Sequence, residues 1–125
     1  DGILAVCLLL EIMSATGQDI AGLYEQLTAL YGKSYYTRVD SPAKPEIKER
    51  FKHLKAESFA ELKTFAGQEV LRVRDTDGIK IYLKDSWLLA RASGTENIIK
   101  LYAETFKSQE YLDTLIAEGK KLFSV

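Results

Sequence analysis

The stretch DGIKIYLKDSWLLARASGTENIIKLYAE, residues 77–104, contains three apolar, β-prone runs separated by short polar connections. Residues 79–84 and 87–90 are joined by the tight turn Asp85-Ser86, and residues 98–106 form the third run. Neighbouring strands that are joined by tight turns must run antiparallel. The stretch therefore predicts the centre of an antiparallel sheet.

Two further runs extend this sheet toward the N-terminus. Residues 69–74 alternate in polarity and lead into Asp75-Thr76-Asp77-Gly78, where Gly78 is free to take the positive φ of a hairpin turn. Residues 35–40 are a short run of aromatic and β-branched residues, which favours a strand. We therefore expect an antiparallel sheet of four or five strands.

Apolar residues at helical spacing lie between and after these strands. Ile47, Phe51 and Leu54 form one apolar stripe on a charged helix, and we expect a further short helical turn within residues 59–65. Ser108 can cap a final amphipathic helix. An antiparallel sheet with helices packed on one face is an α+β layer architecture, and this is the fold class that we expect.

The first 33 residues have a different pattern. Residues 3–15 predict a helix that is apolar nearly all round, and Asp19 can cap a second helix. The apolar run is shorter than the roughly 20 residues that span a bilayer, and it lacks the basic start and cleavage site of a signal peptide. A deeply buried helix fits this run better, and we expect Cys7, the only cysteine, to be a core residue. The location that we expect for the protein is cytoplasmic.

The charge balance limits the partners. The chain has 17 basic and 18 acidic residues, which argues against a general nucleic-acid or anionic-membrane surface. Tyr82, Trp87 and Tyr102 would suit a nucleic-acid-binding module only on the open face of the sheet, and we expect them in the core. A non-catalytic protein-interaction domain that docks through residues 3–15 is a further alternative.

The connection between residues 87–90 and 98–106 carries more polar groups than a turn needs. Arg91 offers a planar fork of donors that matches two phosphate oxygens, and Ser93 and Thr95 add hydroxyl groups. Gly94 allows the backbone to turn where a side chain would obstruct it, so that N–H groups could converge on one anion. The loop is either an anion site or a polar connection in which Arg91 pairs with Glu96.

The sequence RASGTE, followed by IIKLYAE and preceded by DGIKIYLKDSWLLA, resembles the C-terminal domain of the α-D-phosphohexomutases. This family includes phosphoglucomutase and phosphomannomutase, and its usual loop is R-P-S-G-T-E-P. Ala92 and Asn97 replace the two prolines here, which implies a more flexible loop. The opening DGILAVCLLLEIM resembles the last helix of the family's third domain. Residues 1–33 are thus expected to end the third domain, and residues 34–125 to form the fourth.

The resemblance implies a four-domain enzyme that moves a phosphoryl group between the 1- and 6-positions of a hexose phosphate. It uses a phosphoserine, a hexose 1,6-bisphosphate intermediate and Mg²⁺, and the fourth domain grips the phosphate that does not react. The phosphate-binding residues implied here are Arg91, Ser93, Gly94 and Thr95, with Asn97 and Lys100 as further candidates. The family's nucleophile and metal motifs are absent, so we expect them in missing upstream domains and expect this fragment alone to be inactive.

Overall fold

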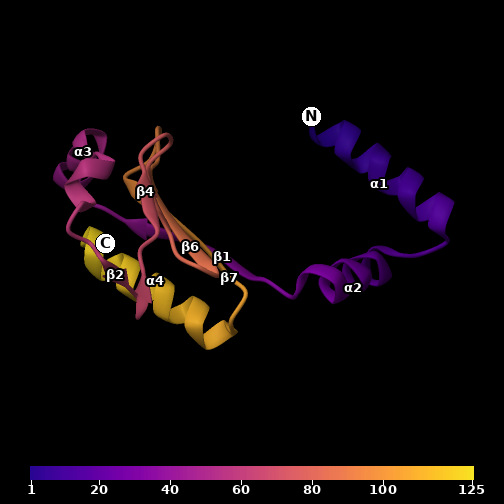
Figure 1. Ribbon diagram of the computed structural model, residues 1–125. Helices are drawn as coiled ribbons and strands as arrows, with labels where there is room; N and C mark the ends of the chain where they lie inside the picture. Colours follow the sequence, from indigo (N-terminus) through magenta and orange to yellow (C-terminus); the bar gives the residue numbers. More distant parts are fainter. The chain divides into compact units, whose positions relative to one another are not determined.

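The computed structural model describes all residues, 1–125, and divides into two compact units, Asp1–Lys33 and Ser34–Val125 (Figure 1). The first unit consists of α1 (Gly2–Thr16) and α2 (Ile20–Tyr31). The Asp19 side chain accepts a hydrogen bond from the Gly22 N–H at 2.8 Å and caps α2 as expected. The two helices predicted at this end of the chain are therefore present.

The helices of the first unit contain no buried residue. Cys7 is exposed, so the expectation that it lies in a core is wrong for this chain. The physical reason is that α1 is apolar on every side, and a two-helix unit offers too little surface to cover it. No single helix is long and apolar enough to cross a membrane. The pair α1 and α2, which is bent by 87°, has sufficient length and apolar composition only when the two helices are taken together.

The second unit contains a five-stranded antiparallel sheet with the strand order β1-β7-β6-β5-β4. Its strands are β1 (Tyr35–Pro42), β4 (Arg72–Arg74), β5 (Ile79–Tyr82), β6 (Ser86–Ala92) and β7 (Ile98–Thr105). A two-stranded hairpin and three helical segments complete the unit: β2 (Thr64–Phe65), β3 (Gln68–Glu69), α3 (Pro45–His53), the short 3-10 helix η1 (Ala56–Phe59) and α4 (Gln109–Phe123). The predicted α+β fold and the strand number are confirmed.

The segment before the sheet's edge strand differs from the expectation. The helical turn ends at Phe59, and Phe65 lies instead in β2. Ala66 and Gly67 form the tight turn between β2 and β3. Their φ values of 48° and 74° fit a two-residue hairpin turn, which needs positive φ at both positions. The strand predicted over residues 69–74 is consequently split, since its start pairs with β2 and only β4 joins the large sheet.

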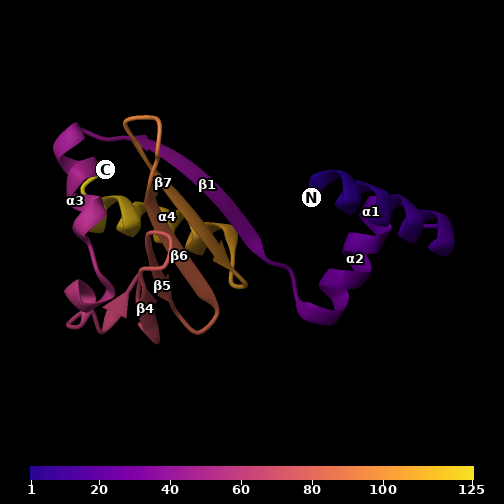
Figure 2. The same ribbon diagram turned by 90° about the horizontal axis from the view of Figure 1, so that it is seen from above.

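The core lies between the sheet and α4, which runs along one face of the sheet (Figures 1 and 2). Every second residue of the central strands points into it, and Ile81, Leu88 and Leu101 are fully buried there. Gly119 allows α4 to approach closely, because a Cβ atom at this position would lie 2.8 Å from Cδ2 of Leu88. Alternation along the strands therefore decides which residues face α4.

The intervening residues project from the opposite face of the sheet, which we call the open face. Tyr82, Trp87 and Tyr102 lie there and are half-buried, so the expectation that these rings belong to the core is wrong. Their neighbours in sequence are buried, and a strand places adjacent side chains on opposite faces. Cations of the chain already cover these rings, with Arg72 4.2 Å from the centre of Tyr82 and Lys80 Nζ 3.8 Å from that of Trp87.

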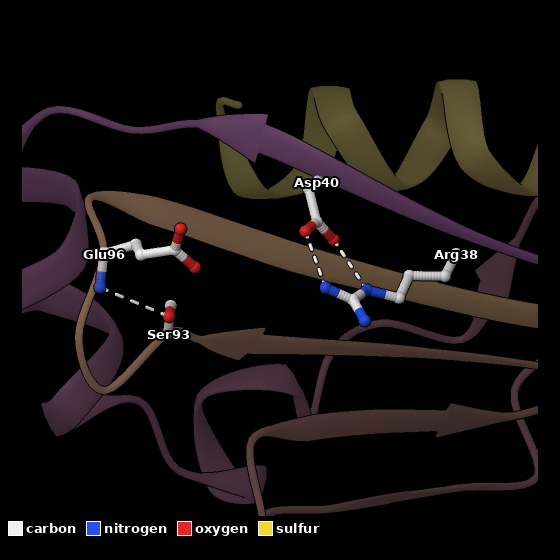
Figure 3. Close-up of polar contacts among 4 residues, drawn as sticks. All are labelled: Arg38, Asp40, Ser93 and Glu96. Carbon is white, nitrogen blue, oxygen red and sulfur yellow. Dashed lines mark hydrogen bonds and ion pairs between the residues drawn. The ribbon is translucent and has the colours of Figure 1, made fainter.

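An ion pair on β1 also belongs to the open face (Figure 3). Arg38 donates from Nε and Nη2 to the two carboxylate oxygens of Asp40, at 2.8 and 2.6 Å. These hydrogen bonds, assisted by the charges of Arg38 and Lys100, lower the pKa of Asp40 below its ordinary value. Asp40 is therefore held ionised beside Lys100, its partner across the β1–β7 ladder.

Replacement of Leu101 by alanine should destabilise the second unit by about 3 kcal/mol, because the variant loses a fully buried side chain and leaves a cavity. Urea unfolding measures this loss. The matched control is Leu71→Ala on an exposed leucine, which should cost less than about 0.5 kcal/mol. Equal losses in the two variants would contradict the placement of the core.

The stabilisation from Asp40 should depend on pH. Its folded-state pKa is lowered, so its contribution is present above the pKa of the unfolded chain and disappears as pH falls through the folded-state pKa. Asp40→Asn should therefore lower the free energy of unfolding at neutral pH and leave it unchanged in strong acid, as measured by urea unfolding. Asp85→Asn, which removes an exposed carboxylate outside any ion pair, is unfolded in parallel as the control for loss of an acidic residue.

Candidate functional site

The loop between β6 and β7 lies at the end of the sheet where α3 and the β4–β5 turn also lie (Figure 2). Two contacts hold these segments together. The Ala43 N–H, between β1 and α3, donates to the Asn97 carbonyl oxygen at 3.0 Å. Arg91, at the base of the loop, contacts Asp77 in the β4–β5 turn. Two segments that are distant in the sequence, the β1–α3 connection and the β4–β5 turn, thus contact the loop and its base.

Ser93 makes hydrogen bonds to two other residues of the loop region, one of which is drawn in Figure 3. Its backbone N–H donates to the carbonyl oxygen of Ile98 at 3.0 Å, and its Oγ accepts a hydrogen bond from the Glu96 N–H at 3.3 Å. The residue is only 4% exposed. Because Oγ acts as an acceptor within the loop, its hydroxyl hydrogen is left for a second partner. Ser93 therefore both shapes the loop and retains one donor.

The tip of the loop presents donors without partners. Gly94, Thr95 and Asn97 are exposed, and the N–H groups of Gly94 and Thr95 donate no hydrogen bond. The φ angle of Gly94 is outside the left-handed region and a Cβ atom there would meet nothing within 4 Å, so the expectation that a side chain would obstruct the turn is wrong. The space above Gly94 is open, and a ligand could approach the backbone closely.

Two cations stand at the base of the loop. Arg91 and Lys100 are direct partners in the β6–β7 ladder, so their side chains project from the same open face. Nη1 of Arg91 donates to Oδ2 of Asp77 at 2.6 Å. The alternative in which Arg91 pairs with Glu96 is wrong, because Arg91 forms its ion pair with Asp77. The structure therefore brings Arg91 and Lys100 together and leaves the acidic side chain of the loop unattached.

Lys48 is a residue near the loop that sequence reasoning missed. Its Nζ donates to the Glu96 carbonyl oxygen at 2.8 Å and adds a third positive charge beside the loop. The sequence contains no signal for this contact, because Lys48 is one of many charged residues on α3 and the distance to Glu96 depends on the packing of α3 against the end of the sheet.

The remaining polar residues near this end have structural contacts. The Asp75 carboxylate accepts a hydrogen bond from the Ala56 N–H at 3.1 Å, and His53 is exposed, with Nε2 3.6 Å from the Glu49 carboxylate. The chain contains no group of three or more histidine, cysteine, aspartate or glutamate side chains that could hold a metal ion. The loop and its neighbours offer hydrogen-bond donors and positive charge.

Comparisons with known proteins point to one family. A family model described as the phosphoglucomutase/phosphomannomutase C-terminal domain matches residues 36–120. The phosphoglucomutase of Komagataeibacter xylinus is 36% identical over 132 residues, which cover 99% of this chain and 24% of the relative. A phosphoglucosamine/phosphogalactosamine mutase of Sulfurisphaera tokodaii is 31% identical over 122 residues, which cover 98% of this chain and 24% of that protein.

The structural comparison agrees. A crystal structure of a phosphomannomutase candidate from Thermus thermophilus superposes with a TM-score of 0.66 at 30% identity, covering 100% of this chain and 22% of that one. The chain thus spans about a quarter of the length of the relatives that it matches. The match covers the sheet, the loop and α3 together. The chain therefore belongs to the phosphoglucomutase/phosphomannomutase family, and residues 36–120 match the family's C-terminal domain.

Proposed function

We propose that this chain supplies the phosphate-binding domain of a cytoplasmic phosphohexomutase, which interconverts hexose 1-phosphate and hexose 6-phosphate through a phosphoserine and a bisphosphate intermediate. The loop between β6 and β7 grips the phosphate that does not react. The residues that hold it are Arg91, Ser93, Gly94 and Thr95, with Asn97 and Lys100 beside them.

The observation that carries this proposal is the set of unpartnered donors at the tip of the loop above two cations. The N–H groups of Gly94 and Thr95 lack partners, and Arg91 and Lys100 project from adjacent positions at the base. A phosphate dianion accepts several hydrogen bonds and is stabilised by nearby cations, so it satisfies both kinds of group at once. The Glu96 carboxylate has no partner and can turn away from the anion.

The chemical contribution of such a domain is positioning and charge neutralisation. A substrate held by its distal phosphate presents the other end of the sugar to reacting groups elsewhere, which lowers the entropic part of the barrier. Because the loop contacts the phosphate and not a particular carbon, it accepts a sugar phosphate in either orientation. The Mg²⁺ that the family uses would be bound by residues outside this chain, since the chain has no suitable cluster of ligands.

We propose a structural role for the first unit as well. Residues 1–33 would form the C-terminal helices of the third domain, with α1 buried against preceding parts of the same protein. The exposure of Ile3, Val6 and Leu10 supports this assignment, because each is more than half exposed and full burial of each would be favourable, by at most about 1.5–3 kcal/mol. The relatives are long enough to supply that surface, since the chain covers only 24% of the Komagataeibacter xylinus protein.

The phosphate grip is tested by titrating the ¹⁵N-labelled chain with glucose 6-phosphate, with glucose as the control. We expect the amide signals of Ser93, Gly94 and Thr95 to shift with the phosphate and not with glucose. Arg91→Ala should weaken binding at least about tenfold, because a charge-assisted hydrogen bond is lost. Arg74→Ala, which removes an exposed arginine from β4 instead, is the matched control.

Equal shifts with glucose and glucose 6-phosphate would contradict phosphate recognition. Unchanged affinity in Arg91→Ala would contradict the role of the arginine. A single-stranded oligonucleotide that shifts the indole signal of Trp87 and leaves the loop unchanged would favour nucleic-acid binding on the open face.

A second prediction concerns the full-length protein. The isolated chain should show no mutase activity, because the groups that transfer the phosphoryl lie elsewhere. In the full-length protein, Arg91→Ala should lower kcat/KM by about a hundredfold, since a misplaced substrate reacts poorly. A coupled assay of glucose 6-phosphate formation measures both. Full activity of the Arg91→Ala protein would contradict the proposal.

A further inference from the structure

The β4–β5 turn packs directly on the backbone at Arg91. Gly78 has a φ of 91°, a conformation that side-chain-bearing residues rarely adopt. A Cβ atom at Gly78 would lie 2.4 Å from the Ala90 carbonyl oxygen and 2.7 Å from Cβ of Arg91. Only glycine allows the turn to come this close, and the close approach places the preceding residue, Asp77, beside the Arg91 side chain.

The contact between Asp77 and Arg91 involves only one of the three guanidinium nitrogens, Nη1. Nη1 donates to Oδ2 of Asp77 at 2.6 Å, while Nε and Nη2 donate to nothing. A guanidinium has five N–H donors, and bidentate binding of a phosphate needs one edge with two of them. Asp77 therefore fixes the side chain and leaves the Nε–Nη2 edge available.

We propose that Asp77 is a positioning residue for Arg91, which holds the guanidinium in place before substrate arrives. The inference rests on the proposed function, because the free edge is the part that would bind phosphate. Asp77 also carries a negative charge, which by itself opposes an anion at this site. The hydrogen bond and the charge thus act in opposite directions, and two substitutions separate them.

Asp77→Asn and Asp77→Ala remove the same charge, but asparagine retains an oxygen that can accept the bond from Nη1. Without any ligand, ¹⁵N relaxation of the Arg91 Nε–H group should report a rigid side chain in the wild type and in Asp77→Asn. In Asp77→Ala its order parameter should fall below about 0.6, the range of flexible groups. Equal order parameters in Asp77→Asn and Asp77→Ala would overturn the proposal.

Glucose 6-phosphate then tests the consequence for binding. Asp77→Asn should bind it about fivefold more tightly than Asp77→Ala, the effect of one hydrogen bond. Equal affinities of the two variants would overturn the positioning role even if the wild type binds well. Asp85→Ala, in the β5–β6 turn at the opposite end of the sheet, controls for loss of an exposed aspartate and should match the wild type.

The two hypotheses fail in different ways. If neither the wild-type chain nor Arg91→Ala binds glucose 6-phosphate, the proposed phosphate site is wrong. The relaxation comparison needs no ligand and still decides whether Asp77 holds Arg91. If the wild type binds and both Asp77 variants keep a rigid Arg91, the phosphate site stands and the positioning role is rejected.

Discussion

The register between β6 and β7 is the constraint on which the candidate site depends. It pairs Ala90 with Leu101 on the core face and Arg91 with Lys100 on the open face. A slip by one residue would move the apolar set to the open face and drive Arg91 toward the core, at the cost of burying a charge. The burial of Ala90 and Leu101 therefore holds the two cations together at the base of the loop. The stability of the core and the placement of the charges come from the same pairing.

Much of the fold follows from local pattern. Alternating apolar residues on three closely spaced strands, with a glycine in the hairpin turn at Gly78, leave few alternatives to an antiparallel sheet. The prediction was wrong at the edge of the sheet, where the pattern of alternating residues and the turn before it indicated different structures. The alternation over residues 69–74 suggested one continuous strand, whereas the tight turn at Ala66-Gly67 takes the start of that segment into a separate hairpin.

The candidate site was less predictable, for a physical reason. The loop's residue types indicated anion binding, but the partner of Arg91 could not be derived from spacing. Glu96 is near in sequence, yet Arg91 projects from the end of a strand toward a turn 14 residues earlier. The sequence predicted that Asp77 lies in a hairpin turn, and the structure places it in the β4–β5 turn. Its second contact depends on how closely Gly78 packs on β6, which only the three-dimensional structure shows.

Overall charge was a poor guide to the open face. The chain has a net charge of −1, yet alternation on the strands sends Arg38, Arg72 and Lys80 to one side of the sheet together with the two cations at the base of the loop. Because fields from exposed charges are screened within about 10 Å at moderate salt, an anion near the loop responds to Arg91 and Lys100 more than to charges at the far end of the sheet. The strand register, and not the net charge of the chain, therefore decides how much positive charge lies beside the loop.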